Sequence, residues 1–313
     1  MRPYRFLIIA LIMTLCLACA AGPAPEKAPA DIHQGVRHLN KGTAYYIKGC
    51  YSKALQHIQE AHERFVATDH LQGTADSLNT MANIYFRMDD FNSALALYDE
   101  SIALFRQLGD TVGQVRALTN KAAALVAAKR TNEAERTLEL ADMAAGDRNV
   151  LPALRLKTRA LLFIEQDQTG KAEKLLTRSL RFVSTQDRAL LADIHYTLGH
   201  ALLADGRPEQ AIDHLEIALE QDRTAGAYFQ IGMDLAALGA CFQHMEQYAD
   251  AIDRFKRSLK IFALMEAPHK VSEVLPGLKA SAEKSGDPDP AVQATLKWAE
   301  LWLAGHREAN LCR

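Results

Sequence analysis

The chain has 313 residues, is 49% hydrophobic and carries a formal net charge of −2 at pH 7. Because the sequence shows no basic face, binding to nucleic acid is not expected. Glycine and proline are sparse after residue 30, and alternating runs of β-branched residues are missing, so we expect an all-α fold.

The first 18 residues form a segment distinct from the rest of the chain. Arg2 and Arg5 precede an apolar run from Phe6 to Ala18, and small residues follow it. The run is short for a membrane-spanning helix, which needs about 20 residues. Residues 1–18 therefore have the pattern of an export signal peptide.

Three ways of processing this signal are compatible with the residues at its end. Leu17-Ala18-Cys19 resembles the cleavage site of a bacterial lipoprotein, in which Cys19 becomes the lipidated first residue. Ordinary cleavage after Ala20 is the second way, and an uncleaved anchor is the third. We favour the first. Residues 19–33 would then be a lipid-attached, proline-rich tether, and the chain would be anchored by its lipid in the bacterial cell envelope, facing the periplasm.

From residue 34 to residue 266 the sequence repeats with a period near 40 residues. When the first alanine of each unit is counted as position 20, positions 8, 20 and 27 are small in all six units. The residues at position 20 are Ala54, Ala94, Ala134, Ala172, Ala211 and Ala251. Large apolar residues occupy positions 11 and 24, and a polar break separates two helices in each unit. The pattern predicts six helix–turn–helix units stacked in an array.

This pattern resembles the tetratricopeptide repeat, in which small residues recur together at these three positions. The period is longer than the 34 residues typical of that repeat, which implies longer second helices or connections. The resemblance implies an α-solenoid, a right-handed superhelix whose first helices line a concave groove. We expect residues 267–313, which contain Trp298 and Trp302, to form helices that cap the array.

The groove positions of the family select ten residues for binding a protein or peptide partner. They are Tyr46, Asp76, Asn79, Asn83, Phe86, Arg87, Arg116, Asn120, Tyr196 and His200. Asn79 and Asn83 could each pair with an extended peptide backbone, and Arg116 with a carboxylate. The clamp that some family members use for acidic tails is only half present, because Asn79 stands where they have lysine. A solvated polar lining is the alternative interpretation of these residues.

Three cysteines, Cys50, Cys241 and Cys312, follow the signal region, and an odd number cannot all pair within one chain. Cys50 and Cys241 are almost five repeats apart, which we take as too far for a disulfide. Cys241 and Cys312 could pair near the C-terminal end. Buried or unpaired thiols are the alternative.

No local pattern indicates catalysis or metal binding. His57 and His62 are five residues apart, as are His195 and His200, and this spacing does not place two ligands on one helix face. There is also no nucleophile elbow or phosphate loop. We expect His38 and His195 to be partly buried helix residues with one polar partner. The sequence therefore predicts neither an enzyme nor a bound cofactor or metal.

These observations together favour a membrane-tethered periplasmic scaffold that mediates protein–protein interactions, in assembly of an envelope or secretion complex. The alternative is a regulator whose groove senses a short signalling peptide. An envelope enzyme or enzyme accessory is the third possibility. The partner, the pathway and the oligomeric state are not indicated by any residue pattern.

Overall fold

The computed structural model describes residues 30–148, 150–286, 289–305 and 312 of the chain. Within these ranges the regular elements are fourteen α-helices and one short 3-10 helix, without a strand, so the all-α class is confirmed. The elements are α2 (Ala30–Lys48), α3 (Tyr51–Ala67), α4 (Leu71–Arg87), α5 (Phe91–Leu108), α6 (Thr111–Ala127), α7 (Thr131–Ala145), η1 (Gly146–Arg148), α8 (Pro152–Glu165), α9 (Thr169–Leu180), α10 (Arg188–Ala204), α11 (Pro208–Ala225), α12 (Tyr228–His244), α13 (Tyr248–Leu264), α14 (Pro268–Ser285) and α15 (Pro290–Leu303). The predicted signal peptide, Cys19 and the spacer up to residue 29 lie outside the described residues. Among the helices that are described, none combines the length and the apolarity that a membrane span requires.

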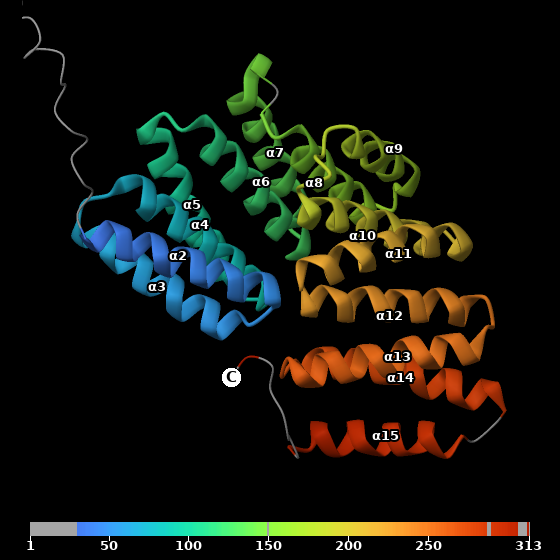
Figure 1. Cartoon of the computed structure of the whole chain (residues 1–313). Helices are drawn as coiled ribbons and strands as arrows, with labels where there is room; N and C mark the ends of the chain where they lie inside the picture. Colours follow the sequence, from blue (N-terminus) through green and yellow to red (C-terminus); the bar gives the residue numbers. More distant parts are fainter. Residues whose placement is uncertain (1–29, 149, 287–288, 306–311, 313) are drawn as a thin grey trace, which may run out of the picture.

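The helices stack as antiparallel pairs in chain order (Figure 1). Six pairs, from α2/α3 to α12/α13, are followed by the pair α14/α15 at the C-terminal end. Each helix packs on the next one along the chain, and Trp302 is buried in the core that α13, α14 and α15 share. The predicted α-solenoid of six units with a C-terminal helix pair is confirmed.

The turn inside each of the six pairs has the same backbone conformation at the same place. The residue at position 15 has a positive φ in every unit: Gly49, Asp89, Lys129, Asp167, Gly206 and Glu246. A left-handed conformation costs an L-residue roughly 1–2 kcal/mol, and two of the six positions avoid that cost with glycine. These turns coincide with the polar breaks in the sequence, which explains why the breaks recur with the period of the repeat.

The small residue at position 8 is required because the two helices of a pair cross there. A Cβ atom built on Gly42 would lie 2.4 Å from Ile58 Cδ1 and 3.1 Å from the carbonyl oxygen of position 20. A Cβ atom on Gly199 would lie 2.6 Å from Leu215 Cγ. Real Cβ atoms essentially never approach other atoms within 3.0 Å, so at these crossings the side chain of position 24 fills the space that a larger residue would need.

The small residue at position 27 has a second role in alternate units. In the second, fourth and sixth units it is a serine whose buried hydroxyl donates a hydrogen bond across the pair to the carbonyl oxygen of position 1. The bonds are Ser101 to Ala75 at 3.0 Å, Ser179 to Ala153 at 2.7 Å and Ser258 to Gly232 at 2.7 Å. A net hydrogen bond of this kind contributes about 0.5–1.5 kcal/mol, so these serines add to the packing of the pairs that carry them.

The array curves until its first pair meets its sixth (Figure 1). The Tyr51 ring lies edge-on to the Phe229 ring, with centroids 5.5 Å apart, and α2 contacts α12. At this contact Gly49 has a φ of +84°, and a Cβ atom there would lie 2.5 Å from Phe229 Cβ. The turn between α2 and α3 therefore fits against α12 only with glycine at position 49.

A disulfide bond spans the same region of the molecule. Cys50 is bonded to Cys312, which lies 262 residues later in the chain, with the two Cα atoms 5.4 Å apart. Cys241 is buried and its thiol is free. The pairing of Cys241 with Cys312, which the sequence left open, is therefore excluded, and the alternative of a buried, unpaired thiol holds for Cys241. The curvature of the whole array places Cys312 beside the first turn.

We predict that a methyl group at one helix crossing will destabilise the fold. Gly199→Ala should lower the free energy of unfolding by about 1–3 kcal/mol, because Leu215 and the backbone of α11 must move to make room. Gly170→Ala on α9 is the matched control, since a Cβ atom there has nothing within 4 Å; it should be neutral or stabilising by up to about 1 kcal/mol. Urea denaturation followed by circular dichroism measures both, and equal effects of the two substitutions would contradict the crossing argument.

Candidate functional site: the concave face

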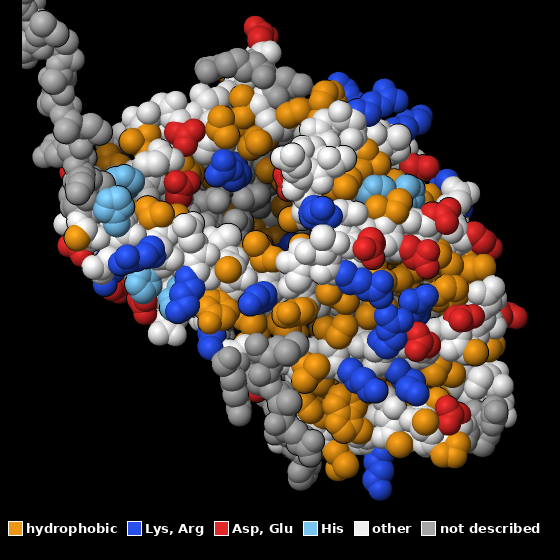
Figure 2. Space-filling model, viewed as in Figure 1, with side chains coloured by type: hydrophobic (Ala, Val, Ile, Leu, Met, Phe, Trp, Pro, Cys, Tyr) orange, Lys and Arg blue, Asp and Glu red, His pale blue; other side chains and the backbone are white. Residues whose placement is uncertain are grey.

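The first helices of the pairs form the inner wall of the curve. Each of α2, α4, α6, α8, α10 and α12 contacts the next one in this series, whereas the second helices of neighbouring pairs among the six have no comparable contact in the described chain. Elements on the inside of a curve approach one another more closely than those outside. Figure 2 shows this face hollowed at its centre, with side chains of both charges around the opening. We call this space the hollow.

Two predicted residues form a loose ion pair between neighbouring first helices. Asp76 Oδ1 on α4 lies 4.0 Å from Arg116 Nη1 on α6, and both side chains are partly exposed. Gln72 Nε2 donates a hydrogen bond to Asp76 Oδ2 at 3.2 Å. Burial raises the pKa of Asp76, and the contacts with Gln72 and Arg116 oppose that shift. At this distance the pair is easily separated, so both charges are available to a ligand.

The three predicted asparagines occupy different environments. Asn79 is only 5% exposed, and its Oδ1 is buried without a hydrogen-bond partner among the described residues. Asn83 Oδ1 accepts a hydrogen bond from the Tyr98 hydroxyl at 2.6 Å. Asn120 is half-buried on α6. Asn79 therefore lies beneath the surface of the hollow, and Asn83 already uses one of its acceptors to hold α5 against α4.

Charged side chains from three different pairs meet deeper in the hollow. Lys157 Nζ on α8 lies 2.5 Å from Asp193 Oδ2 on α10. Burial alone would raise the pKa of Asp193, but Lys157 and Arg87 together hold it below its usual value. Arg87, at the end of α4, donates a hydrogen bond from Nε to the Tyr46 hydroxyl at 3.4 Å. The wall of the hollow thus joins α2, α4, α8 and α10 through one network of charges and hydrogen bonds.

The remaining predicted residues add aromatic surface. The Tyr196 and His200 rings on α10 are 6.2 Å apart, and the Arg87 guanidinium lies 5.9 Å from the centre of the half-buried Phe86 ring. Burial raises the pKa of Tyr196 and lowers that of His200. His200 is nevertheless exposed to water, which is consistent with a side chain on a concave wall, where protein surrounds a group that solvent still reaches.

Two residues of this network, Lys157 and Asp193, were not among those predicted from the sequence, although their positions in the repeat could have revealed them. Lys157 stands at position 5 of the fourth unit and Asp193 at position 2 of the fifth, both groove positions of the repeat. Neither belongs to a recognisable local motif, and their contact joins residues 36 positions apart. Only the placement of α8 beside α10 makes them a pair.

Two buried carboxyl groups lie at the other side of this network. Asp222 at the end of α11 is 5% exposed and Asp234 on α12 is 1% exposed. Neither oxygen of Asp234 has a hydrogen-bond partner in the described chain. Burial raises the pKa of Asp234 to about 9 and that of Asp222 to about 7, and the two carboxyl groups face each other. Such a pair is stable when one group is protonated and donates to the other.

Paired helices, a repeated close crossing and a concave wall of first helices define this protein as a helical repeat protein of the α-solenoid class. The tetratricopeptide repeat family profile matches residues 36–107, 73–141 and 190–263, which is more than half of the chain. The chain belongs to the tetratricopeptide repeat family. The resemblance inferred from the small residues at positions 8, 20 and 27 is confirmed. Its fold is that of a scaffold for protein–protein interactions.

Several regulators share this architecture. The regulatory protein RapG of Bacillus subtilis (strain 168) is 24% identical over 245 residues, which cover 77% of this chain and 66% of RapG; the chain thus spans just under two thirds of the length of that relative. The Rap conjugation gene regulator of plasmid pLS20, solved in complex with the Phr* peptide, superposes with a TM-score of 0.63 at 16% identity, over 95% of this chain and 82% of that one. A Rap protein complexed with Competence and Sporulation Factor gives a TM-score of 0.58 at 14% identity, over 83% and 79% of the two chains. These similarities establish a shared fold.

We predict that the Asp222–Asp234 pair makes the protein less stable as the pH rises. The pair holds at least one proton in the folded state at pH values where the unfolded chain, with aspartate pKa values near 3.9, has released it. The free energy of unfolding should therefore fall between about pH 4 and pH 9, by at most about 1.4 kcal/mol per pH unit for one proton. Asp234→Asn keeps the shape and can donate to Asp222, so its stability should fall less over pH 6–9.

The control for this measurement is Asp213→Asn, which alters an exposed carboxylate on the same helix as Asp222. Denaturation curves recorded at a series of pH values give the slope for each variant. Asp213→Asn should keep the slope of the unmodified protein. A slope for Asp234→Asn equal to that of the control would show that the buried pair does not bind the extra proton.

Proposed function

We propose that the chain binds a short, extended peptide in the hollow. The observation that carries this proposal is the loose ion pair of Asp76 and Arg116, which presents an anion and a cation on adjacent first helices at the wall of the hollow. A short peptide carries both charges at its termini. Its carboxylate can pair with the Arg116 guanidinium in bidentate geometry while an amine or a basic side chain pairs with Asp76.

The closure of the array supports a short ligand over a long one. The contact of Tyr51 with Phe229 and the Cys50–Cys312 bond bound the concave face where its two ends meet. A helix or strand that runs along every repeat and continues past the array would have to cross this junction. A short segment can enter the hollow from its open face (Figure 2) and needs no such crossing.

The relatives support the same proposal. One protein with this fold was solved with a peptide, and another carries the description of a regulatory protein. Recognition of an extended peptide by side chains along a groove is a general use of such a surface. A regulator that responds to a peptide therefore fits this chain better than a scaffold for a large envelope assembly.

We predict that short peptides selected from a random library on the purified full chain will depend on Arg116. Arg116→Ala should weaken their binding at least tenfold, about 1.4 kcal/mol, in fluorescence anisotropy. Arg106→Ala is the matched control, because Arg106 is exposed on α5, a second helix, and it should bind as the unmodified protein does. Both variants should melt at the same temperature. Failure to select any peptide, or equal binding by the two variants, would refute the proposal, and capture of intact proteins without peptides would favour the scaffold.

We also propose that the chain acts outside the cytoplasm, tethered to a membrane through Cys19. Two observations support this. The N-terminal residues have the signal and cleavage pattern described above, and Cys50 and Cys312 form a disulfide, a bond that persists in oxidising compartments and is rare in the cytosol. The proline-rich spacer after Cys19 would hold the array away from the lipid surface.

The tether has its own test. Cys19→Ser should abolish incorporation of a labelled fatty acid and release the protein from the membrane fraction, because the thiol that carries the lipid is lost. Cys16→Ser is the matched control within the same segment and should leave labelling unchanged. Equal labelling and sedimentation of the two variants would exclude lipidation at Cys19 without affecting the peptide proposal.

A further inference from the structure

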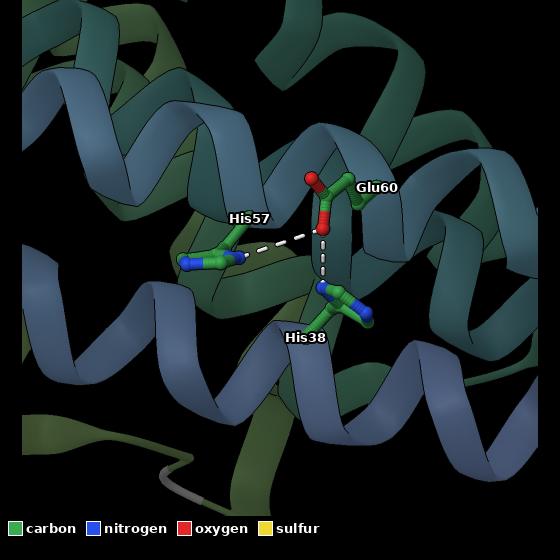
Figure 3. A group of neighbouring side chains, drawn as sticks. All are labelled: His38, His57 and Glu60. Atoms are coloured by element: carbon green, nitrogen blue, oxygen red, sulfur yellow. Dashed lines mark ion pairs between the residues drawn. The ribbon is translucent and has the colours of Figure 1, made fainter.

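The first helix pair contains a cluster of metal-ligating side chains outside the hollow network. His38 comes from α2, and His57 and Glu60 come from α3, where they are three residues apart and share a helix face. Figure 3 shows both imidazole rings directed at the Glu60 carboxylate in the space between the two helices. No spacing motif reveals this group in the sequence, because one of its members lies on a different helix.

The atoms are spaced as ligands of one small cation would be. Glu60 Oε2 lies 2.5 Å from His38 Nδ1 and 3.5 Å from His57 Nδ1, and one ligand atom from each residue lies within 4.8 Å of the other two. Zinc bonds of about 2.0–2.1 Å in tetrahedral geometry place neighbouring ligand atoms about 3.3 Å apart. The observed separations of 2.5 and 3.5 Å lie on either side of that value. Small side-chain rotations are therefore enough to place all three ligand atoms around one ion.

Glu60 is the group that both histidine nitrogens approach. Both Nδ1 atoms are buried and make no well-aligned hydrogen bond in the described structure, despite their proximity to Glu60. Buried polar atoms normally have a well-aligned hydrogen-bond partner, and a bound ion is another way to satisfy them. Two buried nitrogens that converge on one carboxylate therefore point to a shared cation more directly than either residue alone.

The surroundings of the cluster hold the His57 ring in position. The Tyr45 ring stacks on His57 with centroids 5.5 Å apart and an angle of 13° between the planes. The Lys53 ammonium lies over the Tyr45 ring, 5.4 Å from its centroid. Arg64, one turn beyond Glu60, is paired with Asp31 at 3.0 Å. The stack with Tyr45 therefore restricts the orientation of the His57 ring.

We propose that His38, His57 and Glu60 bind one zinc ion that joins α2 to α3, with the fourth position open to water. Neutral imidazole and carboxylate suit zinc, whereas calcium and magnesium prefer sites made of oxygen atoms. The Glu60 side chain is 39% exposed, which gives the ion a path from solvent. Because the ligands come from both helices, the ion stabilises the folded first pair and not the unfolded chain.

The proposal is tested by titrating zinc into the purified full chain after removal of metals with a chelator. Competition with a chromophoric chelator should give one zinc per chain, and the melting temperature should rise by several degrees. His38→Ala and Glu60→Gln should each weaken binding at least tenfold. X-ray absorption should show nitrogen and oxygen ligands near 2.0–2.1 Å. Magnesium at the same concentration should neither bind nor stabilise.

Two controls distinguish this site from histidines elsewhere. His33→Ala removes an exposed histidine from the same helix as His38, and His195→Ala removes one member of a pair whose Nδ1 atoms are 3.0 Å apart. Both variants should bind zinc as the unmodified protein does. Loss of the stoichiometric ion in either control, or its retention in His38→Ala and Glu60→Gln together, overturns the assignment. Glu60→Gln preserves size and shape, so it separates loss of a ligand from loss of folding.

Discussion

The close crossing of the two helices in each pair is the constraint on which the rest of the structure depends. At Gly42 and Gly199 there is no space for even one methyl group, and the large residue at position 24 closes the remaining gap. Small residues set the distance at which the two helices cross, so each pair is a rigid unit. Each unit packs on the next in the same way. Regular addition of such units produces the curvature, and the curvature produces the hollow.

The curvature is also what brings distant residues into contact. Tyr51 meets Phe229, and Cys50 meets Cys312, because the small rotations between successive pairs accumulate until the first and sixth pairs are neighbours. The charges that line the hollow then face one another across it, and Lys157, held beside Asp193, is neutralised rather than left as an isolated buried cation. The same geometry that makes a binding surface therefore also closes it and supplies its internal ion pairs.

The crossing within a helix pair is set locally, whereas the curvature is the sum of the rotations between successive pairs. This difference explains what the sequence could predict. The recurring small residues assign a repeat position to each residue. These positions predict the helix pairs, their turns and the helix face on which Arg87 and Arg116 lie. They do not give the angle between successive pairs. The Cys50–Cys312 bond, the Lys157–Asp193 contact and the buried Asp222–Asp234 pair all depend on that angle, or on which helix ends meet, so none of them follows from periodicity. The histidine cluster was missed for a simpler reason, since its members lie on two helices.

The first helix pair links the two proposed sites. Tyr46, which accepts a hydrogen bond from Arg87 at the wall of the hollow, lies on α2, and so does His38. The turn that ends α2 carries Gly49, which contacts α12, and Cys50, which is bonded to Cys312. An ion that joins α2 to α3 acts on the element that closes the array. If zinc changes the affinity of the chain for a peptide, thermodynamic linkage requires the peptide to change the affinity for zinc by the same factor. The size of that factor measures how strongly the first helix pair couples the two proposed sites.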